Sequence, residues 1–463
     1  MRSGWTRRGL LRALAAALAA PALAGCSGGP RAASAGAKPV GETRSVIVVG
    51  AGIAGLAAAQ RLIARGVERV VVLEARDRIG GRLHSVTRDG MTYDMGASWL
   101  HGIDSNPLVA LVDDLGLRRV VTDYDARTDY DRSGREVDDD YEDRLTALLE
   151  AIEALAEAGP DRSLREVFDE ALRRSGASAT EAEIMRYALN VEVECEFGAS
   201  ADALSAQCFD EGVEYEGDDA IIPAGYSRLA ESLAAGLDVR LGQVVTAVEV
   251  LDGGVEITAN GEVFLADRAI ITLPHGVLQA GVVEFSPVLS SAKLRAIGRL
   301  HSGLLQKVWL RFDEAFWHEA GDDVFIGYRG GDGRFEEWLD LSAVPGLEGT
   351  PVLLALNAGT VAEAYEAMTD DAIVADAMQA LRVIFGDDIP VPSDALVSRW
   401  GQDAFSRGAY SSLGVGACRE DRVAMAAIEH GRLHFAGEAT SVDNPSSAQG
   451  AWASGLRAAD EVS

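Results

Sequence analysis

The sequence predicts an α/β fold, in which a dinucleotide-binding Rossmann-like domain is interleaved with a second domain of α+β type. Three observations lead to this prediction. A glycine turn near the start joins a β-branched run to an Ala/Leu-rich helix, a second glycine motif follows, and a strand, a turn and a glycine-studded helix close the chain. Both ends of the chain therefore build one nucleotide site, and the second domain comes from inserts between them.

The first 26 residues have the features of an export signal. Arg7 and Arg8 precede an apolar run, Ala13–Ala24, that is too short and too alanine-rich for a membrane span. The segment resembles a twin-arginine signal, and its end resembles the cleavage box of a bacterial lipoprotein. We therefore expect export to the cell envelope, the periplasm or the outer surface, with a lipid on Cys26 as the only membrane contact. An ordinary cleaved signal is the alternative, and residues 27–43 predict a flexible tether.

The composition limits the class of partner. The formal net charge is −30 at pH 7, and the signal itself carries four arginines, so the mature chain is more acidic still. Such a field repels nucleic acid and attracts cations. Two explanations of this acidic net charge stay open: a cationic substrate, or simply the solubility of an acidic protein. Cys195, Cys208 and Cys418 have no metal-ligand spacing and imply no disulfide framework, so we expect no metal.

A strand, a glycine turn, a helix, a second strand and an acid follow one another from Ser45 to Glu74. Gly50 allows the tight turn, Gly52 lets the backbone approach a pyrophosphate, and Gly55 lets the helix pack closely on the strand. The helix N-terminus offers free N–H groups to the phosphates. Glu74 is placed to accept hydrogen bonds from ribose hydroxyls. This order of elements predicts a dinucleotide site.

The next motif favours FAD over NAD. Arg76, the pair Gly80 and Gly81, and Arg82 resemble the second glycine motif of flavoproteins with two dinucleotide folds, in which these residues lie against the FAD pyrophosphate. Near the C-terminus, Glu438 precedes a glycine-studded helix; in such flavoproteins this acid binds a ribose or the ribityl chain, and the helix N-terminus faces the flavin. A cofactor that is loaded before export explains the twin-arginine signal.

Several motifs in order extend this similarity from about Ser45 to the C-terminus. They include DMGASWLHG at Asp94–Gly102, AIIPAGYSRLAESL, RWGQDAFSRGAYSSLGVG and FAGEAT. On these motifs the chain resembles the flavin-dependent amine oxidases, and within them the polyamine oxidases. The resemblance assigns these residues to the surroundings of FAD: Ala54, Glu74, Arg76, Arg82, Ser98, Trp99, Val245, Glu438, Ser447 and Ala448.

Lys307 lies in an alternating run, GLLQKVWLRF, that predicts a strand. A lysine there either faces solvent, which the alternation permits, or is buried at considerable cost. The resemblance implies the buried, catalytic role: Lys307 matches the lysine that holds a water against flavin N5. Burial lowers the pKa of such a lysine.

Two aromatic residues near the C-terminus also match the family. Tyr410 corresponds to the first of the two aromatics that flank the amine in monoamine oxidases, and Ser447 stands where the second would be, so the resemblance implies a half-open substrate site. Trp400 resembles the tryptophan near the flavin, although a purely structural aromatic is the alternative. Ala409 replaces the cysteine that bonds to FAD in monoamine oxidases, so we expect non-covalent FAD.

His101 distinguishes the branches of the family, because amino-acid oxidases have a substrate-gripping arginine in this segment. A neutral histidine can hydrogen-bond an amine nitrogen, so the resemblance implies a substrate contact and a catalytic role, with a structural histidine as the alternative. The remote nitrogens of a polyamine are cationic and need carboxylates. We expect Glu211 to bind one of these nitrogens; the alternative is that Glu211 belongs to a solvated acidic face. The wider set of candidates is Glu192, Glu194, Glu196, Asp210, Glu211, Glu214 and Glu216.

These residues predict an FAD-dependent polyamine oxidase. It oxidises a C–H bond beside an amine of spermine- or spermidine-type substrates with O2, and gives an imine that hydrolyses to an aldehyde, a shorter amine and H2O2. The alternatives are another flavin amine or amino-acid oxidase, or a non-catalytic flavin- or amine-binding lipoprotein. The sequence does not choose the polyamine, the side of cleavage or the oligomeric state.

The predicted domains and elements follow from the same motifs. The FAD-binding domain comprises residues 44–125, 220–300 and 396–463, and the substrate-binding domain comprises residues 126–219 and 301–395. Strands are expected at 45–49 and 70–73, and largely helical segments at 145–172 and 370–385.

Overall fold

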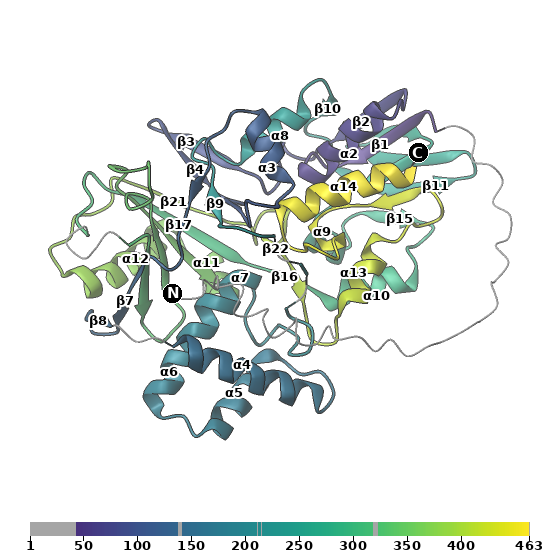
Figure 1. The fold of residues 1–463 in the computed structure, drawn as a ribbon. Coiled ribbons are helices and arrows are strands. Elements are labelled where there is room, and N and C mark those ends of the chain that lie inside the picture. The colour runs from purple at the N-terminus through teal and green to yellow at the C-terminus, as the bar shows by residue number, and fades with distance from the viewer. Residues whose placement is uncertain (1–42, 138–140, 211, 214, 318–322, 463) are drawn as a thin grey trace.

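The computed structural model describes residues 43–137, 141–210, 212–213, 215–317 and 323–462. The predicted signal, Cys26 and nearly all of the tether lie outside the described residues. Two large sheets organise the rest, with a layer of helices on each and a separate group of helices beside them (Figure 1). No helix in the described ranges combines the length and the hydropathy that crossing a membrane requires.

The first large sheet has five parallel strands, in the order β10-β2-β1-β14-β23. The strands β1, β2, β14 and β23 are almost fully buried, as the continuous β-branched runs predict for a parallel sheet covered on both faces, whereas the edge strand β10 is partly exposed. The strands expected at 45–49 and 70–73 are confirmed. The elements of this layer are β1 (Ser45–Val49), β2 (Arg69–Leu73), β10 (Asp238–Arg240), β14 (Arg268–Ile271) and β23 (Leu433–Phe435), with the helices α2 (Ile53–Ala64), α8 (Ser227–Ala234) and α14 (Ala448–Val462) packed on it.

Helices α2 and α14 lie side by side although they come from opposite ends of the chain (Figure 1). Their contact is close because it uses small residues: a Cβ placed on Gly455 would lie 2.1 Å from the carbonyl oxygen of Ala54. The two ends of the chain therefore meet at the N-terminus of α2, where the sequence predicts the nucleotide site.

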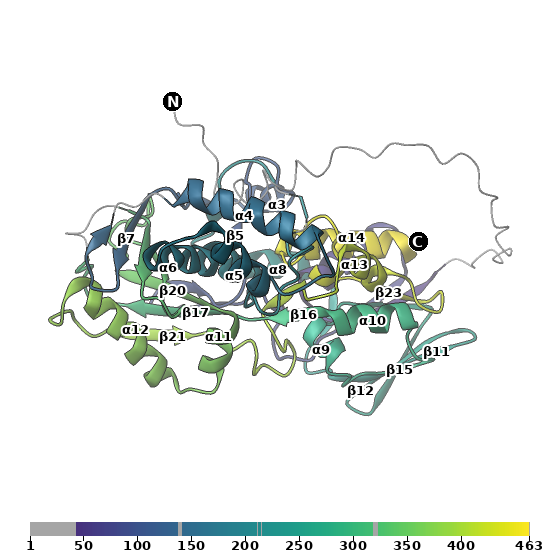
Figure 2. The same ribbon diagram turned by 90° about the horizontal axis from the view of Figure 1, so that it is seen from below.

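A four-stranded sheet lies beside the first, in the order β13-β12-β11-β15 (Figure 2). It buries its inner face against the five-stranded sheet and the helices α10 and α13. Its elements and the helices near it are β11 (Val245–Leu251), β12 (Gly254–Ala259), β13 (Glu262–Ala266), β15 (Glu284–Ser286), α9 (His275–Gln279), α10 (Ser291–Arg299) and α13 (Arg419–Ala426).

The second large sheet has seven strands, in the order β21-β17-β20-β19-β18-β7-β8. All of its pairs are antiparallel except β18 with β7. Its strands are β7 (Arg127–Asp131), β8 (Glu136–Val137), β17 (Leu305–Arg311), β18 (Phe325–Arg329), β19 (Glu337–Asp340), β20 (Val352–Ala358) and β21 (Asp394–Val397), and α11 (Gly359–Glu366) and α12 (Asp370–Phe385) cover one face. The helix expected at 370–385 and the strand expected around Lys307 are confirmed.

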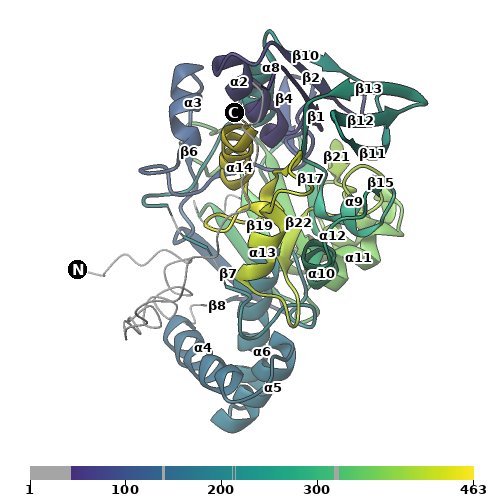
Figure 3. The same cartoon turned by 90° about the vertical axis from the view of Figure 1, so that its right-hand side faces the viewer.

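A group of helices projects from this sheet (Figure 3). The segment expected to be largely helical at 145–172 forms most of α4 (Glu142–Glu157) and most of α5 (Leu164–Ser175), and α6 (Ala179–Ala188) follows. The chain then passes into a π-helix, η1 (Leu189–Glu194), and a short turn of helix, α7 (Cys195–Phe197). Such wide turns are frequent at functional sites because they re-aim side chains.

Short elements connect the two large sheets. The β5–β9–β6 sheet is the most important of them for the site, since its strands carry the ends of two cavity-lining loops. The connecting elements are β3 (Ser85–Arg88), β4 (Met91–Asp94), β5 (Trp99–Leu100), α3 (Leu108–Asp114), β6 (Val120–Val121), β9 (Ala220–Ile221), β16 (Leu300–Gly303), β22 (Tyr410–Leu413) and the 3₁₀ turn η3 (Glu438–Thr440).

Candidate active site

A cavity of about 850 Å³ runs between the five-stranded and the seven-stranded sheet. Gly55 does not line it but lies beneath it, where a Cβ would come 2.0 Å from the Gly50 carbonyl oxygen. Glu211 lies outside the described residues. The other predicted site residues all line this one cavity: Gly50, Gly52, Ala54, Glu74, Arg76, Arg82, Ser98, Trp99, His101, Val245, Lys307, Trp400, Tyr410, Glu438, Ser447 and Ala448.

The N-terminus of α2 forms one end of the cavity. Gly52 is the N-cap residue and supplies no side-chain cap, so side chains leave the first N–H groups of the helix open to a ligand. A Cβ on Gly52 would meet nothing within 4 Å, so the space in front of the backbone is empty of protein. Behind it, Glu74 accepts hydrogen bonds from the backbone N–H groups of Ala51 (2.7 Å) and Arg76 (2.9 Å). This end fits the pyrophosphate and ribose of a dinucleotide.

The side chain of Arg76 braces this end against a loop near the C-terminus. Its Nη2 donates to Asp403 Oδ1 (2.6 Å) and Ser406 Oγ (2.8 Å), and its guanidinium lies 5.5 Å from the centre of the Phe405 ring. The loop after Trp400 is therefore fixed relative to the end of β2, which Glu74 follows.

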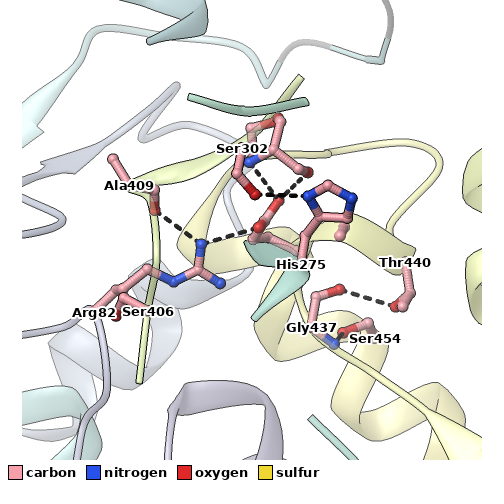
Figure 4. A network of polar contacts seen from close by, with 12 residues as sticks. Arg82, His275, Ser302, Ser406, Ala409, Gly437, Thr440 and Ser454 are labelled. Atoms are coloured by element: carbon pink, nitrogen blue, oxygen red, sulfur yellow. Dashed lines mark hydrogen bonds and ion pairs between the residues drawn. The ribbon is translucent and has the colours of Figure 1, made fainter. Parts of the chain in front are cut away.

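Arg82 and Glu438, which both line the cavity, form an ion pair. Arg82 Nη1 donates to Glu438 Oε1 (3.0 Å) and to the Ala409 carbonyl oxygen (2.8 Å), as Figure 4 shows for its contact with Ala409. Ser411 Oγ donates to Glu438 Oε2 (2.6 Å). Burial alone would raise the pKa of Glu438, but Arg82 and Arg422 outweigh it and hold the pKa below its ordinary value. Glu438 therefore stays ionised.

Lys307 projects from β17 into the cavity and is only 3% exposed. Its Nζ donates to the carbonyl oxygens of Gly96 (2.6 Å) and Asp94 (3.3 Å) and to Ser98 Oγ. It lies 5.3 Å from the centre of a Trp99 ring. Burial lowers the pKa of Lys307 to about 8, against the opposing pull of the Asp94 carboxylate. Lys307 can therefore gain or lose a proton near neutral pH, and it is buried rather than on a solvent face.

The two predicted aromatics are both held by hydrogen bonds. Trp400 Nε1 donates to the Met95 carbonyl oxygen (2.7 Å). The Tyr410 hydroxyl lies 3.0 Å from the Cys195 carbonyl oxygen, at the end of the π-helix. A Cβ on Gly198 would lie 2.8 Å from Tyr410 Cζ, so the glycine leaves room for the ring. These contacts fix the orientation of both rings at the cavity wall.

Ser447 stands at the N-terminal end of α14. Its Oγ donates to the Asn444 carbonyl oxygen (2.8 Å) and accepts from the Gly450 N–H (3.1 Å). The start of α14 thus faces the cavity at Ser447 and Ala448, as the predicted flavin site requires.

His101 has a partner that the sequence analysis did not name. His101 Nδ1 lies 2.7 Å from Asp219 Oδ2, and Asp219 Oδ1 accepts from the Gly102 N–H (2.9 Å). Both residues line the cavity. The two are far apart in the chain, and only the pairing of β5 with β9 brings them together.

The acids predicted for substrate amines separate into two groups. Glu192 and Glu196 line the cavity. Glu194 instead forms an ion pair with Arg165 (2.9 Å), and Asp210 and Glu216 are not among the cavity-lining residues. Glu214, like Glu211, lies outside the described residues.

Glu337 is a further cavity-lining acid that the sequence analysis missed. Its signal is an acid at the start of strand β19, next to the apolar pair Trp338 and Leu339, where it is buried. It accepts a hydrogen bond from Arg127 Nη1 (2.8 Å). The cavity therefore has a lysine on β17 and a carboxylate on β19, with apolar wall between them.

Comparison with known proteins identifies the class. The sequence model of the family described as flavin containing amine oxidoreductase matches residues 53–463, and the chain belongs to this family. It is a flavin enzyme of the amine oxidase class, and the predicted FAD cofactor and enzyme class are confirmed. The N-terminus of α2, Glu74 and Glu438 supply the contacts that FAD needs. That FAD is bound non-covalently stays a prediction.

Particular relatives cover most of the chain. It is 34% identical to "Polyamine oxidase 2" of Arabidopsis thaliana over 452 residues, and the aligned region covers 92% of this chain and 90% of that protein. It is 35% identical over 438 residues to "Polyamine oxidase 4" of Oryza sativa subsp. japonica, covering 90% and 88%. A solved structure of putrescine oxidase bound to putrescine has the same fold, with a TM-score of 0.74, 22% identity and coverage of 90% of this chain and 98% of that one. The predicted fold class is confirmed.

Proposed function

We propose that the protein is an FAD-dependent polyamine oxidase. One observation supports the proposal most strongly. The same cavity is lined by a buried lysine of lowered pKa, Lys307, and by the buried carboxylates of Glu192 and Glu337. The substrate is a spermine- or spermidine-type amine, R–CH2–NH–R′. With O2 it gives the imine R–CH=N–R′ and H2O2, and water then splits the imine into an aldehyde and a shorter amine. The similarity to plant polyamine oxidases supports this choice.

The chemistry that FAD supplies when bound is the acceptance of a hydride equivalent from the substrate carbon and the passage of both electrons to O2. The chain's own residues would hold FAD. The open N-terminus of α2 would bind the pyrophosphate, Glu74 would bind a ribose, and Glu438 and the start of α14 would hold the other end of FAD. Ala409 offers no thiol for a covalent link.

The chain also orients the amine. The carboxylates of Glu192, Glu196 and Glu337 bind the remote ammonium groups, which apolar walls alone would not accept. Tyr410 packs against the chain of the substrate, and Ser447 leaves the opposite side open. Lys307 supplies a hydrogen-bond donor whose proton is loosely held because of its lowered pKa.

We also propose that the protein is exported by the twin-arginine route and anchored by a lipid on Cys26. The support is the twin arginine at Arg7 and Arg8 and the Leu-Ala-Gly-Cys sequence. Metabolic labelling with palmitate tests the lipid anchor. The full chain should be labelled and the Cys26→Ala variant should not, and equal labelling of both would contradict the lipid anchor.

Anaerobic titration of the oxidised holoenzyme tests the function. Spermine, spermidine, their acetyl forms, putrescine and a monoamine are each added, and the flavin absorbance is followed. We expect bleaching by at least one polyamine at concentrations at which the monoamine has no effect. Bleaching by the monoamine alone would favour another amine oxidase, and no bleaching by any amine would favour a binding protein.

A further inference from the structure

We propose that Asp219 positions His101 so that His101 Nε2 accepts the proton of the reacting ammonium group. The proposal rests on the proposed function, because it needs an amine substrate. His101 would contact the substrate, whereas Asp219 would act only through His101.

The backbone places Asp219 opposite His101. In the antiparallel pair of β5 and β9, Leu100 lies opposite Ala220, so the residue after Leu100 and the residue before Ala220, His101 and Asp219, come together. The Asn106 side chain donates to the His101 carbonyl oxygen (2.7 Å) and holds the loop. The pair is therefore built into the fold.

Both oxygens of Asp219 accept hydrogen bonds. Oδ1 accepts from the Gly102 N–H (2.9 Å), and Oδ2 lies 2.7 Å from His101 Nδ1. An ionised carboxylate is only an acceptor, so Nδ1 must carry the proton. In the neutral ring, Nε2 is then the acceptor. A histidine with the opposite tautomer would present an N–H to the amine and could not take its proton.

A short network ties the pair to Lys307. Thr122 donates its N–H to the Asp219 carbonyl oxygen (3.0 Å), and its Oγ1 accepts from Trp99 Nε1 (3.0 Å). The Lys307 Nζ lies over a ring of the same Trp99, 5.3 Å from its centre. His101 thus shares one wall of the cavity with the lysine at the reacting end.

Exposure separates the two roles. The side chain of His101 is 25% exposed, and that of Asp219 is 9% exposed. The imidazole can therefore pass a proton on to water, whereas the carboxylate is largely buried and is oriented by its hydrogen bonds. In the proposed step the substrate N⁺–H bond breaks and an Nε2–H bond forms, which leaves a lone pair on the substrate nitrogen and an imidazolium paired with Asp219. No electron moves in this step.

The Asp219→Asn variant inverts the arrangement without removing bulk. The amide oxygen can still accept from Gly102, and the amide NH2 then donates to Nδ1, so Nε2 carries the proton. At pH 7 we expect the limiting rate of anaerobic flavin bleaching by spermine to fall about 100-fold. The loss should shrink as the pH rises, because more of the amine then arrives neutral. A loss that is equal at every pH would overturn the proposal, as would no loss at all.

Three variants serve as controls for this experiment. Asp219→Glu keeps the carboxylate and should recover most of the rate. Asp104→Asn removes one charge from an exposed residue in the loop after His101 and should leave the pH profile unchanged. His101→Gln should show the pH-dependent loss itself, and adding Asp219→Asn to it should cause no further loss. An additive second loss would show that Asp219 does not act through His101.

The neighbouring groups matter for the pH profile. Titratable groups also line the cavity from the elements next to the pair: Asp123, Tyr124 and Asp125 after β6, Tyr215 and Asp218 before β9, and Lys307 on β17. They are the same in wild type and variant. The difference between the two profiles therefore reports on the pair.

A readout independent of turnover is the imidazole ¹⁵N spectrum of the holoenzyme. The chain has only seven histidines, and His101→Gln assigns the signal of interest. We expect a protonated Nδ1 and an unprotonated Nε2 in wild type, and the reverse in Asp219→Asn. The same tautomer in both would overturn the proposal. If no amine bleaches the flavin, the proposed function fails, but the spectrum still tests the positioning of His101.

Discussion

Lys307 and Glu337 project from the same face of the seven-stranded sheet, two strands apart. Lys307 on β17 pairs with Leu356 on β20, and Leu356 pairs with Glu337 on β19. Directly opposed residues share a face, so the two backbone positions lie about 10 Å apart at the usual strand spacing. The register of β17, β20 and β19 thus sets the distance between Lys307, at the reacting end, and Glu337, the carboxylate for a remote ammonium group.

The Glu337→Gln variant tests this row. We expect KM for spermine to rise about 10- to 100-fold, the cost of losing a charge-assisted hydrogen bond, with a much smaller rise for a monoamine. Steady-state kinetics with both substrates measure it. Glu336→Gln is the matched control, because Glu336 is the adjacent acid and is not among the cavity-lining residues. An equal rise in KM for both substrates would count against the role of Glu337.

The Lys307→Met variant removes the buried ammonium. We expect turnover to fall about 100-fold, since the hydrogen-bond and proton functions at this end are lost. The pH profile should also lose an inflection near the pKa of Lys307, which is about 8. Lys293→Met is the control, because Lys293 is equally buried but does not line the cavity. Comparable losses in both variants would mean that the effect is one of folding.

The Lys293→Met variant should instead change stability with pH. Lys293 Nζ donates to the carbonyl oxygens of Met425 (2.6 Å) and Ala427 (2.8 Å), and burial lowers the pKa of Lys293 to about 7. The folded state therefore disfavours the charged form. Relative to the variant, wild type should lose stability as the pH falls from the ordinary lysine pKa towards 7, and no more below it. Thermal unfolding from pH 6 to 10 measures this difference, and a constant difference would contradict it.

Alanine substitutions at two glycines of the nucleotide site should have different effects, one on FAD binding and the other on folding. A Cβ at Gly52 meets no protein atom within 4 Å, so Gly52→Ala should fold normally but occupy the space of the phosphates and lose FAD. A Cβ at Gly55 would lie 2.0 Å from the Gly50 carbonyl oxygen, so Gly55→Ala should destabilise the fold itself by about 1–3 kcal/mol or more. The flavin-to-protein absorbance ratio and the apoprotein Tm separate the two. Full FAD content in Gly52→Ala would place the pyrophosphate elsewhere.

The absence of a thiol at Ala409 predicts that FAD is released on denaturation. Acid precipitation of the holoenzyme should leave the flavin in the supernatant. The Ala409→Cys variant tests whether the position is close enough to the flavin to form a bond. Flavin that stays with precipitated wild-type protein would contradict non-covalent binding.

Local patterns predicted much of this molecule. The strand at 45–49 and the helix at 370–385 have the predicted bounds, because a β-branched run and a helical periodicity are local properties. The cavity-lining residues of the glycine motifs were also predicted, since each motif carries its own geometry. Lys307 was placed by similarity, as its pattern alone allowed a surface position.

Asp219 and Glu337 were missed for a physical reason. Each reaches the site only through strand pairing between distant segments, β5 with β9 and β17 with β20 and β19. No local pattern encodes that pairing. Glu194 was included among the candidates for a different reason: it lies in the π-helix and forms an ion pair with Arg165, outside the set of cavity-lining residues, and the sequence pattern did not reveal this ion pair.

The central claim is that this cavity oxidises a polyamine, and the release of H2O2 together with identification of the amine product tests it most directly. We predict one H2O2 and one shorter amine for each spermine or spermidine consumed by the holoenzyme, with far lower rates in Lys307→Met. A yellow, folded holoenzyme that releases no H2O2 with any polyamine would contradict the account.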